Sequence, residues 1–179
     1  MLDLAALGQR IVIIGASNGG KSTLAATLGA KLGLPVTHLD QLHHQPHTDW
    51  QPRPTEEFHR LHDEAMGQDA WIIEGNYSSR MPERLARASS VIWLDTAPVP
   101  SAMRYLRRTL FDKMRFGQLE GAPLDRLKWE LFRYILIEQP RNRPKYAALL
   151  AQQSIPVIRL KSMREVRACY RHWSLRAAL

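Results

Sequence analysis

The chain has 179 residues and a formal net charge of +8, with 45% hydrophobic and 23% charged residues. This length suits one domain with a single core, and the composition is that of an ordinary globular protein. No apolar run approaches the roughly 20 residues of a membrane span, and Met1–Leu4 carries an acid where a signal peptide would be basic. We therefore expect a single cytosolic domain over 1–179, in which the lone Cys169 forms no internal disulfide.

Short apolar runs alternate along the chain with segments in which apolar residues recur every three or four positions. The first pattern predicts buried strands and the second predicts amphipathic helices. In the first half these patterns predict a strand over 10–15, a helix over 22–32, a strand over 35–39, a loop over 41–54, a helix beginning at 55 and a strand over 71–74.

The second half continues the alternation. It predicts a helix over 82–88, a strand over 91–94, a helix beginning at 100, a loop over 117–123, a helix beginning at 124 and ending before Pro140, a helix over 144–152, a strand over 155–160 and a helix over 163–177. Strands that alternate with helices indicate an α/β fold with a parallel sheet and right-handed crossovers.

A glycine-rich segment lies between the first predicted strand and the first predicted helix. It fits the pattern G-x-x-x-x-G-K-[ST] at every fixed position, and the strand before it and the helix after it are the context that this motif requires. We expect the segment to bind the phosphates of ATP. Its residues are Gly15, Ala16, Ser17, Asn18, Gly19, Gly20, Lys21, Ser22 and Thr23.

The chemistry of phosphate binding explains these residue types. Glycines allow the backbone N–H groups to turn toward an anion, and the N-terminus of the following helix carries a partial positive charge. Lys21 is predicted to reach the β- and γ-phosphates and to act in catalysis, while the hydroxyl of Ser22 is predicted to bind Mg²⁺. Asn18 suits a left-handed backbone better than most residues other than glycine.

Acidic residues end three of the predicted strands, namely Asp40, Glu74 and Asp95. Ligands of open α/β sheets bind beyond the carboxyl ends of the strands, so the pattern predicts that the three acids share one crevice. Glu74 would then join Ser22 at Mg²⁺, and Asp40 would accept the proton of a phosphoryl acceptor. The alternative is that these acids only cap the next helix or turn.

The surplus of positive charge lies in the second half of the chain. Arg104, Arg108 and Arg115 share one stripe of the helix that begins at 100, and Arg107 flanks them. Arginines in such a segment neutralise charge on a transferring phosphoryl group. The alternative is a solvated or acid-paired helix face. A second candidate pair, Arg141 and Arg143, carries the same alternative.

Six of the seven histidines lie between 38 and 62. His43, His44 and His47 resemble a zinc cluster, but they lie in an irregular loop with no cysteine and no helical pair of histidines. The alternative is that these histidines contact a substrate or simply belong to an exposed loop surface. Trp50 in the same loop is interpreted as covering the core, with stacking on a base as the alternative. Cys169 fits the apolar side of its helix.

The motif order resembles a known family. The segments GASNGGKSTLA, LPVTHLDQL, WIIEGNYSSR, VIWLD and RYLRR are similar to those of the DNA topology modulation protein-like group, which belongs with the adenylate-kinase-type P-loop kinases. The resemblance covers about residues 10–170. It implies a P-loop NTPase three-layer sandwich, with a five-stranded parallel sheet in the order 2-3-1-4-5 and a helical lid at about 115–145.

Matched position by position, the resemblance implies roles for several residues. Asp40 corresponds to an acid that faces the acceptor in related kinases, and Glu74 with Gly75 corresponds to an acid-glycine pair in which relatives more often have Asp. Arg104 and Arg108 correspond to lid arginines. Asn18 stands where the group usually has glycine.

These observations predict an ATP- and Mg²⁺-dependent kinase that phosphorylates a small molecule, with nucleotides and nucleosides among the candidate acceptors. The acceptor would lie over Asp40, Glu74 and the loop 41–54. The rival hypothesis is an NTPase switch that acts on nucleic acid or on a partner protein, which the charge of +8 favours. No recognisable nucleic-acid-binding module supports that rival. The sequence predicts no membrane association and leaves the oligomeric state open.

Overall fold

The computed structural model describes residues 2–111, 116–121, 127 and 129–176, without the side chains of Arg108 and Phe111. Five parallel strands form one sheet in the order β2-β3-β1-β4-β5, which confirms the α/β fold class and the predicted strand order. The strands are β1 (Arg10–Gly15), β2 (Val36–His38), β3 (Trp71–Glu74), β4 (Ser90–Leu94) and β5 (Val157–Leu160).

Helices connect these strands. The α-helices are α1 (Lys21–Leu32), α2 (Leu39–His43), α3 (Thr55–Gly67), α4 (Met81–Arg87), α5 (Pro98–Phe111), α6 (Trp129–Arg133), α7 (Gln139–Arg141), α8 (Arg143–Ala151) and α9 (Met163–His172). Two 3₁₀ turns, η1 (Leu4–Leu7) and η2 (Ser78–Arg80), and one π-helical segment, η3 (Tyr134–Glu138), complete the described elements.

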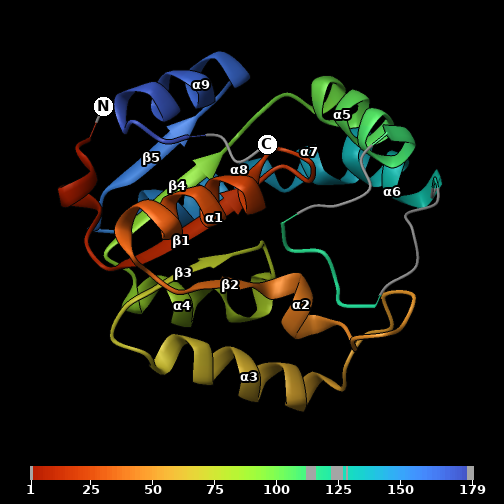
Figure 1. Cartoon of the computed structure of the whole chain (residues 1–179), viewed down its shortest axis with the longest axis horizontal. Coiled ribbons are helices and arrows are strands. Elements are labelled where there is room, and N and C mark those ends of the chain that lie inside the picture. The colour runs from red at the N-terminus through yellow and green to blue at the C-terminus, as the bar shows by residue number, and fades with distance from the viewer. Residues whose placement is uncertain (1, 112–115, 122–126, 128, 177–179) are drawn as a thin grey trace.

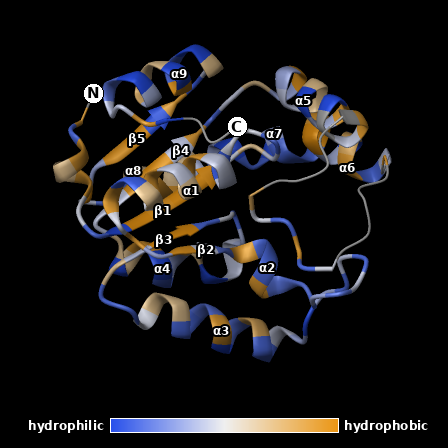
Figure 2. Ribbon diagram, viewed as in Figure 1, coloured by the Kyte–Doolittle hydropathy of each residue, from blue (hydrophilic) through white to orange (hydrophobic). Residues whose placement is uncertain are grey.

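Alternating side chains of β1 divide the core into two layers. Ile11 and Ile13 pack with apolar residues of α1 and α9, whereas Val12 and Ile14 pack with residues of α3, α4 and α8. Helices therefore cover both faces of the sheet (Figure 1), and the apolar strands lie between them (Figure 2). This arrangement is the predicted three-layer sandwich, and the predicted core position of Cys169 is confirmed.

The polypeptide differs from the sequence prediction after β2. We predicted a strand to residue 39 and then a loop, but Leu39–His43 forms the short helix α2. Leu39 is fully buried, and its packing under Gly75 favours a turn of helix at this point. Asp40 therefore lies in the first turn of a helix rather than at the end of a strand.

A second difference lies near Pro140, where we predicted a helix to end. The chain instead stays helical through η3 and α7, and Pro140 occupies the first turn of α7. Proline is tolerated in the first turn of an α-helix. The preceding π-helical turn also changes which backbone groups pair.

The segment between β4 and β5 has a small core of its own. Ala102 and Tyr105 of α5 pack on Ile135 of η3, with Leu131 and Phe132 of α6 beside them. The prediction of a lid at about 115–145 stays a prediction, because much of that range lies outside the described residues. In the described part of the chain, no helix has both the length and the apolar character needed to cross a membrane.

Candidate phosphate and acceptor site

A cleft of about 1000 Å³ opens at the carboxyl ends of β2 and β3. One side is formed by the P-loop, a second by α2 and the segment after β3, and a third by α5, α6, η3 and α8. The cleft therefore lies where ligands bind in open α/β sheets. It is lined by Lys21, Ser22, Asp40 and Glu74, which sequence reasoning had predicted to act together.

The P-loop has the backbone that its sequence predicts. Asn18 has a φ of 56° and Gly20 a φ of 95°, so both residues adopt the left-handed region, as predicted for Asn18. The N–H of Gly19 donates to the carbonyl of Ala16 at 2.9 Å, and a Cβ atom on Gly19 would lie only 2.7 Å from that oxygen. Helix α1 begins directly after this turn, at Lys21.

The first glycine of the loop is held by Asn76, which sequence reasoning did not single out. Asn76 Oδ1 accepts the N–H of Gly15 at 2.9 Å, and Nδ2 donates to the carbonyl of Gly15 at 3.0 Å. Below this contact lies the fully buried Arg84, whose Nη2 donates to the carbonyls of Gly75 and Asn76. The segment after β3 is thus fixed to the P-loop on one side and to α4 on the other.

Glu74 connects the P-loop to β2. Its Oε1 atom accepts from Ser22 Oγ at 2.8 Å and lies 2.8 Å from Nδ1 of His38. Burial of the carboxyl acts to raise its pKa, but the hydrogen bond with His38 and the charge of Lys21 outweigh burial, and Ser22 adds to them, so the pKa of Glu74 is lowered. A charged carboxylate next to a hydroxyl is a donor set that suits Mg²⁺.

Asp40 faces the cleft from α2. Its Oδ1 atom accepts the hydroxyl of Tyr77 at 2.7 Å, and both residues line the cleft. Burial raises the pKa of Tyr77, and the neighbouring carboxylate of Asp40 raises it further. Tyr77 therefore stays a hydrogen-bond donor at neutral pH and orients the carboxylate.

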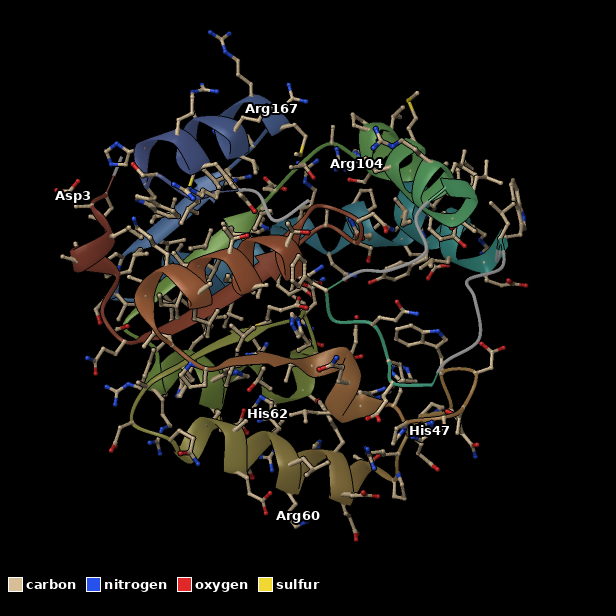
Figure 3. All side chains as sticks on the ribbon, viewed as in Figure 1. Asp3, His47, Arg60, His62, Arg104 and Arg167 are labelled. Atoms are coloured by element: carbon tan, nitrogen blue, oxygen red, sulfur yellow. The ribbon has the colours of Figure 1, made fainter. Side chains whose placement is uncertain are left out.

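Two side chains from the segment between β4 and β5 contact the P-loop backbone. Arg104 of α5, labelled in Figure 3, donates from Nε to the carbonyl of Asn18 at 2.7 Å. Gln139 of α7 accepts the N–H of Ser17 at 2.7 Å. Lys21 is also within this network, because its Nζ donates to the carbonyl of Ala16 at 3.2 Å. Arg104 and Lys21 therefore both donate to carbonyls of the same loop.

The remaining arginine predictions have mixed outcomes. The side chain of Arg108 and the whole of Arg115 lie outside the described residues. Arg107 is exposed, as is Arg141. Arg143 is engaged elsewhere, because its guanidinium binds both the carboxylate and the carbonyl of Asp95.

Asp95 does not share the crevice of Asp40 and Glu74, and the prediction that it would do so is wrong. Its carboxylate is bound by Arg143 and by Arg159, which donates from Nη2 at 2.6 Å. This cluster borders a separate small cavity behind Gly15. The physical reason is the strand order, because β4 lies on the opposite side of β1 from β2 and β3.

The histidine-rich loop contributes to the wall of the cleft. His44 and Trp50 line it, with ring centroids 5.2 Å apart in an edge-to-face arrangement. Trp50 is half-buried at this wall, where our sequence interpretation favoured the core. Within residues 2–111, 116–121, 127 and 129–176, no group of three or more potential ligands that could hold a metal ion is present.

Several cleft residues were not foreseen, among them Asn76, Tyr77, Tyr134, Glu138 and Tyr146. The position of Asn76 and Tyr77 could have indicated their role, because both follow a strand at the sheet edge where ligands bind. No local pattern marks the others, since only tertiary packing brings η3 and α8 over the loop.

Comparison with solved structures identifies similar folds. A gluconokinase from Sinorhizobium meliloti 1021 is 14% identical over 94% of this chain and 93% of that one, with a TM-score of 0.56. A shikimate kinase from Acinetobacter baumannii, in complex with shikimate, is 18% identical over 95% and 96%, with a TM-score of 0.56. A shikimate kinase from Bacteroides thetaiotaomicron is 18% identical over 93% and 99%, with a TM-score of 0.51.

At identities this low, the comparisons show similarity of fold alone. No protein-family model matches the sequence, and no curated protein matches it. The chain therefore has the α/β fold of these P-loop kinases, with its cleft at the same sheet edge that the topology predicts.

Proposed function

We propose that this protein is an ATP-dependent phosphotransferase that moves the γ-phosphoryl group of ATP onto a small molecule. One observation carries the proposal. Lys21 and Ser22 of the P-loop, with Glu74 of β3, line the same cleft as Asp40, an acid that accepts a hydrogen bond from Tyr77. A candidate nucleotide-binding loop and a candidate proton acceptor thus share one cleft.

Each residue has a distinct role in this proposal. Lys21 and the N-terminus of α1 stabilise negative charge on the phosphates. Ser22 and Glu74 hold Mg²⁺, which would supply further charge neutralisation at the phosphate oxygens. Asp40 orients the acceptor hydroxyl and accepts its proton. Arg104 acts at the P-loop, with Arg108 proposed as its companion on the same helix.

The other P-loop residues bind phosphate in this proposal, as their sequence predicts. The proteins of similar fold support the proposed kinase activity, because their names identify them as a gluconokinase and two shikimate kinases. Small hydroxyl compounds are consequently the first acceptors to examine.

The test is transfer of label from Mg-ATP carrying a labelled γ-phosphate to a pooled set of nucleosides, nucleotides, sugars and small acids. We expect label on one class of small molecule. Lys21→Ala should abolish the transfer while leaving the fold intact. Lys31→Ala is the matched control, because Lys31 lies on the same helix but is exposed at its far end. Unchanged transfer by Lys21→Ala would contradict the mechanism.

The second candidate is an NTPase that acts on nucleic acid, in line with the resemblance to the DNA topology modulation group. The observation that favours it is the net charge of +8. Such a protein would release phosphate faster with DNA, and its DNA affinity would fall steeply as salt rises. Transfer of label to a small molecule without DNA would exclude it as the main activity.

A further inference from the structure

Among the described residues, the charges that line the cleft sum to a negative value, opposite in sign to the charge of the whole chain. Beyond the P-loop, four carboxylates line the cleft, those of Asp40, Glu74, Glu130 and Glu138, and the lysines that line it are Lys21 and Lys145. The chain as a whole carries +8. A basic protein has therefore placed acids around the position where an acceptor would bind.

Tyrosines form much of the remaining wall. Tyr77, Tyr134 and Tyr146 all line the cleft. Burial raises the pKa of each phenol, and the charges of Glu138 and Asp40 raise that of Tyr134 further. These groups therefore stay neutral at physiological pH. They offer ring faces and hydroxyls to a ligand, but no positive charge that would pair with an anion.

Arginines are the residues that usually bind carboxylates and phosphates through paired hydrogen bonds. No arginine among the described residues lines this cleft. Those nearby are engaged with other groups. Arg104 binds the carbonyl of Asn18, Arg80 pairs with Asp63 and Glu83, and the buried Arg84 supports the Gly75 carbonyl.

Two of the cations lie at the P-loop, whereas Glu138 on another wall has a long, exposed ion pair with Arg133, whose Nε is 3.8 Å from its Oε1. Lys21 and Arg104 both contact the P-loop, where the negative phosphates of ATP are expected. The charges of Glu138 and Asp40 both raise the pKa of Tyr134, which lies in η3 on the other side of the cleft. A negatively charged acceptor would be repelled by the carboxylates of this wall, whereas a hydroxyl or an ammonium group could donate hydrogen bonds to them.

We infer that the acceptor is an uncharged or positively charged alcohol, without a carboxylate or phosphate group, that lies against the tyrosine wall between Asp40 and Glu138. This inference rests on the proposed kinase activity and names the substrate class of the same site. It also separates this chain from the kinases of similar fold named for gluconate and shikimate, both of which are acids.

The test uses matched acceptor pairs that differ in charge alone or nearly so. The pairs are shikimate with its methyl ester, gluconate with glucitol, glucose with glucosamine, and a nucleoside with its 5′-monophosphate. Transfer of the labelled γ-phosphate from Mg-ATP is measured for each member. In the three pairs that contain an anion, we expect the uncharged member to be favoured in kcat/KM by about tenfold or more, and glucosamine should be accepted at least as well as glucose.

A charge-reversal variant connects the preference to the cleft wall. Glu138→Lys should reduce the discrimination against anionic acceptors by about tenfold, because it replaces a repelling group by an attracting one. Asp69→Lys is the matched control, since it makes the same change of charge at an exposed turn before β3. The control should keep the preference of the parent protein.

The outcomes are distinguishable. Equal or better transfer to shikimate, gluconate or the nucleotide would overturn the inference while leaving the kinase activity established. A preference that Glu138→Lys and Asp69→Lys change equally would also overturn it, because the effect would then come from overall charge. Label that reaches no member of any pair counts against the proposed function itself, and the inference falls with it.

Discussion

Asn76 binds both backbone polar groups of Gly15, accepting its N–H at 2.9 Å and donating to its carbonyl at 3.0 Å. The side-chain amide therefore makes the hydrogen bonds that a neighbouring strand would make with Gly15, at the point where β1 ends and the P-loop begins. Gly15 has a φ of 139°, a conformation that few other residues adopt. This contact fixes the entry of the loop.

Asn76→Asp should weaken Mg-ATP binding. The carboxylate can still accept the N–H of Gly15, but it places a negative oxygen against the Gly15 carbonyl. Loss of one part-buried hydrogen bond costs about 1–3 kcal/mol, which predicts a rise in the dissociation constant of about 5- to 160-fold. Isothermal titration calorimetry with Mg-ATP measures it directly.

Asn142→Asp is the control for that experiment, because Asn142 lines the same cleft and the substitution adds the same charge. It should weaken Mg-ATP binding far less than Asn76→Asp does. Equal losses in the two variants would show that charge in the cleft, rather than the grip on Gly15, determines the affinity.

Glu74 should make the stability of the protein depend on pH in the acidic range. The pKa of Glu74 is lowered in the folded state from its ordinary value of 4.5, so the unfolded chain binds this proton more readily. The stabilisation is therefore fully present above that value and is lost as the pH falls through the folded pKa.

Glu74→Gln tests this directly, because glutamine does not titrate. The free energy of unfolding of the parent minus that of the variant should be largest near neutral pH and should shrink as the pH falls below about 4. Urea denaturation over a pH series gives both values. A difference that stays constant with pH would mean that the carboxylate charge contributes nothing through His38 and Ser22. The variant should also lose its response to Mg²⁺ in the transfer assay.

Local patterns predicted the part of the fold that carries phosphate-binding chemistry. The apolar run of β1, the glycine-rich turn and the regular leucines of α1 lie consecutively, so their structure follows from sequence neighbours. The short helix α2 was missed because its five residues span little more than one turn. Its formation depends on Leu39 packing under Gly75, a contact between segments far apart in the chain.

The candidate site was predictable where strand ends and motif agree. Ser22 and Glu74 are separated by 52 positions, yet the rule that ligands bind at the carboxyl ends of strands brought them together. The same rule failed for Asp95, because it does not distinguish strands on the two sides of β1. Gln139 reaches Ser17 across 122 positions from a helix beside a proline, and no sequence pattern indicates that contact.

Arg104→Lys should reduce turnover although the charge is kept. The guanidinium donates from Nε to Asn18 and from Nη2 to Ser101 at 3.0 Å, a geometry that a single ammonium does not reproduce. Loss of this placement is expected to lower kcat about 10- to 100-fold. Steady-state kinetics of phosphoryl transfer measure the change.

Another arginine of α5, three positions after Arg104, gives the matched control. Arg107 is exposed on α5, so Arg107→Lys should leave kcat within about twofold. A larger effect at Arg107 than at Arg104 would move the functional face of α5 toward Arg107.

Asp95→Asn should lower stability and spare catalysis. Asp95 is 4% exposed and is bound by Arg143 and Arg159, which ties α8 and β5 to the end of β4. The two arginine side chains are 40% and 42% exposed, so water can solvate them after the change. The expected loss in the free energy of unfolding is therefore about 1–3 kcal/mol, below that of a fully buried pair.

The kinetic result distinguishes this position from the acids of the cleft. Because Asp95 does not line the cleft, kcat/KM of Asp95→Asn should stay within about threefold of the parent at temperatures where both are folded. Asp40→Asn, a change of the same kind on the cleft wall, should instead lower kcat by about 100-fold or more. If Asp95→Asn lost activity without losing stability, the acid would have a direct role in transfer, and the division between a structural and a functional carboxylate would be wrong.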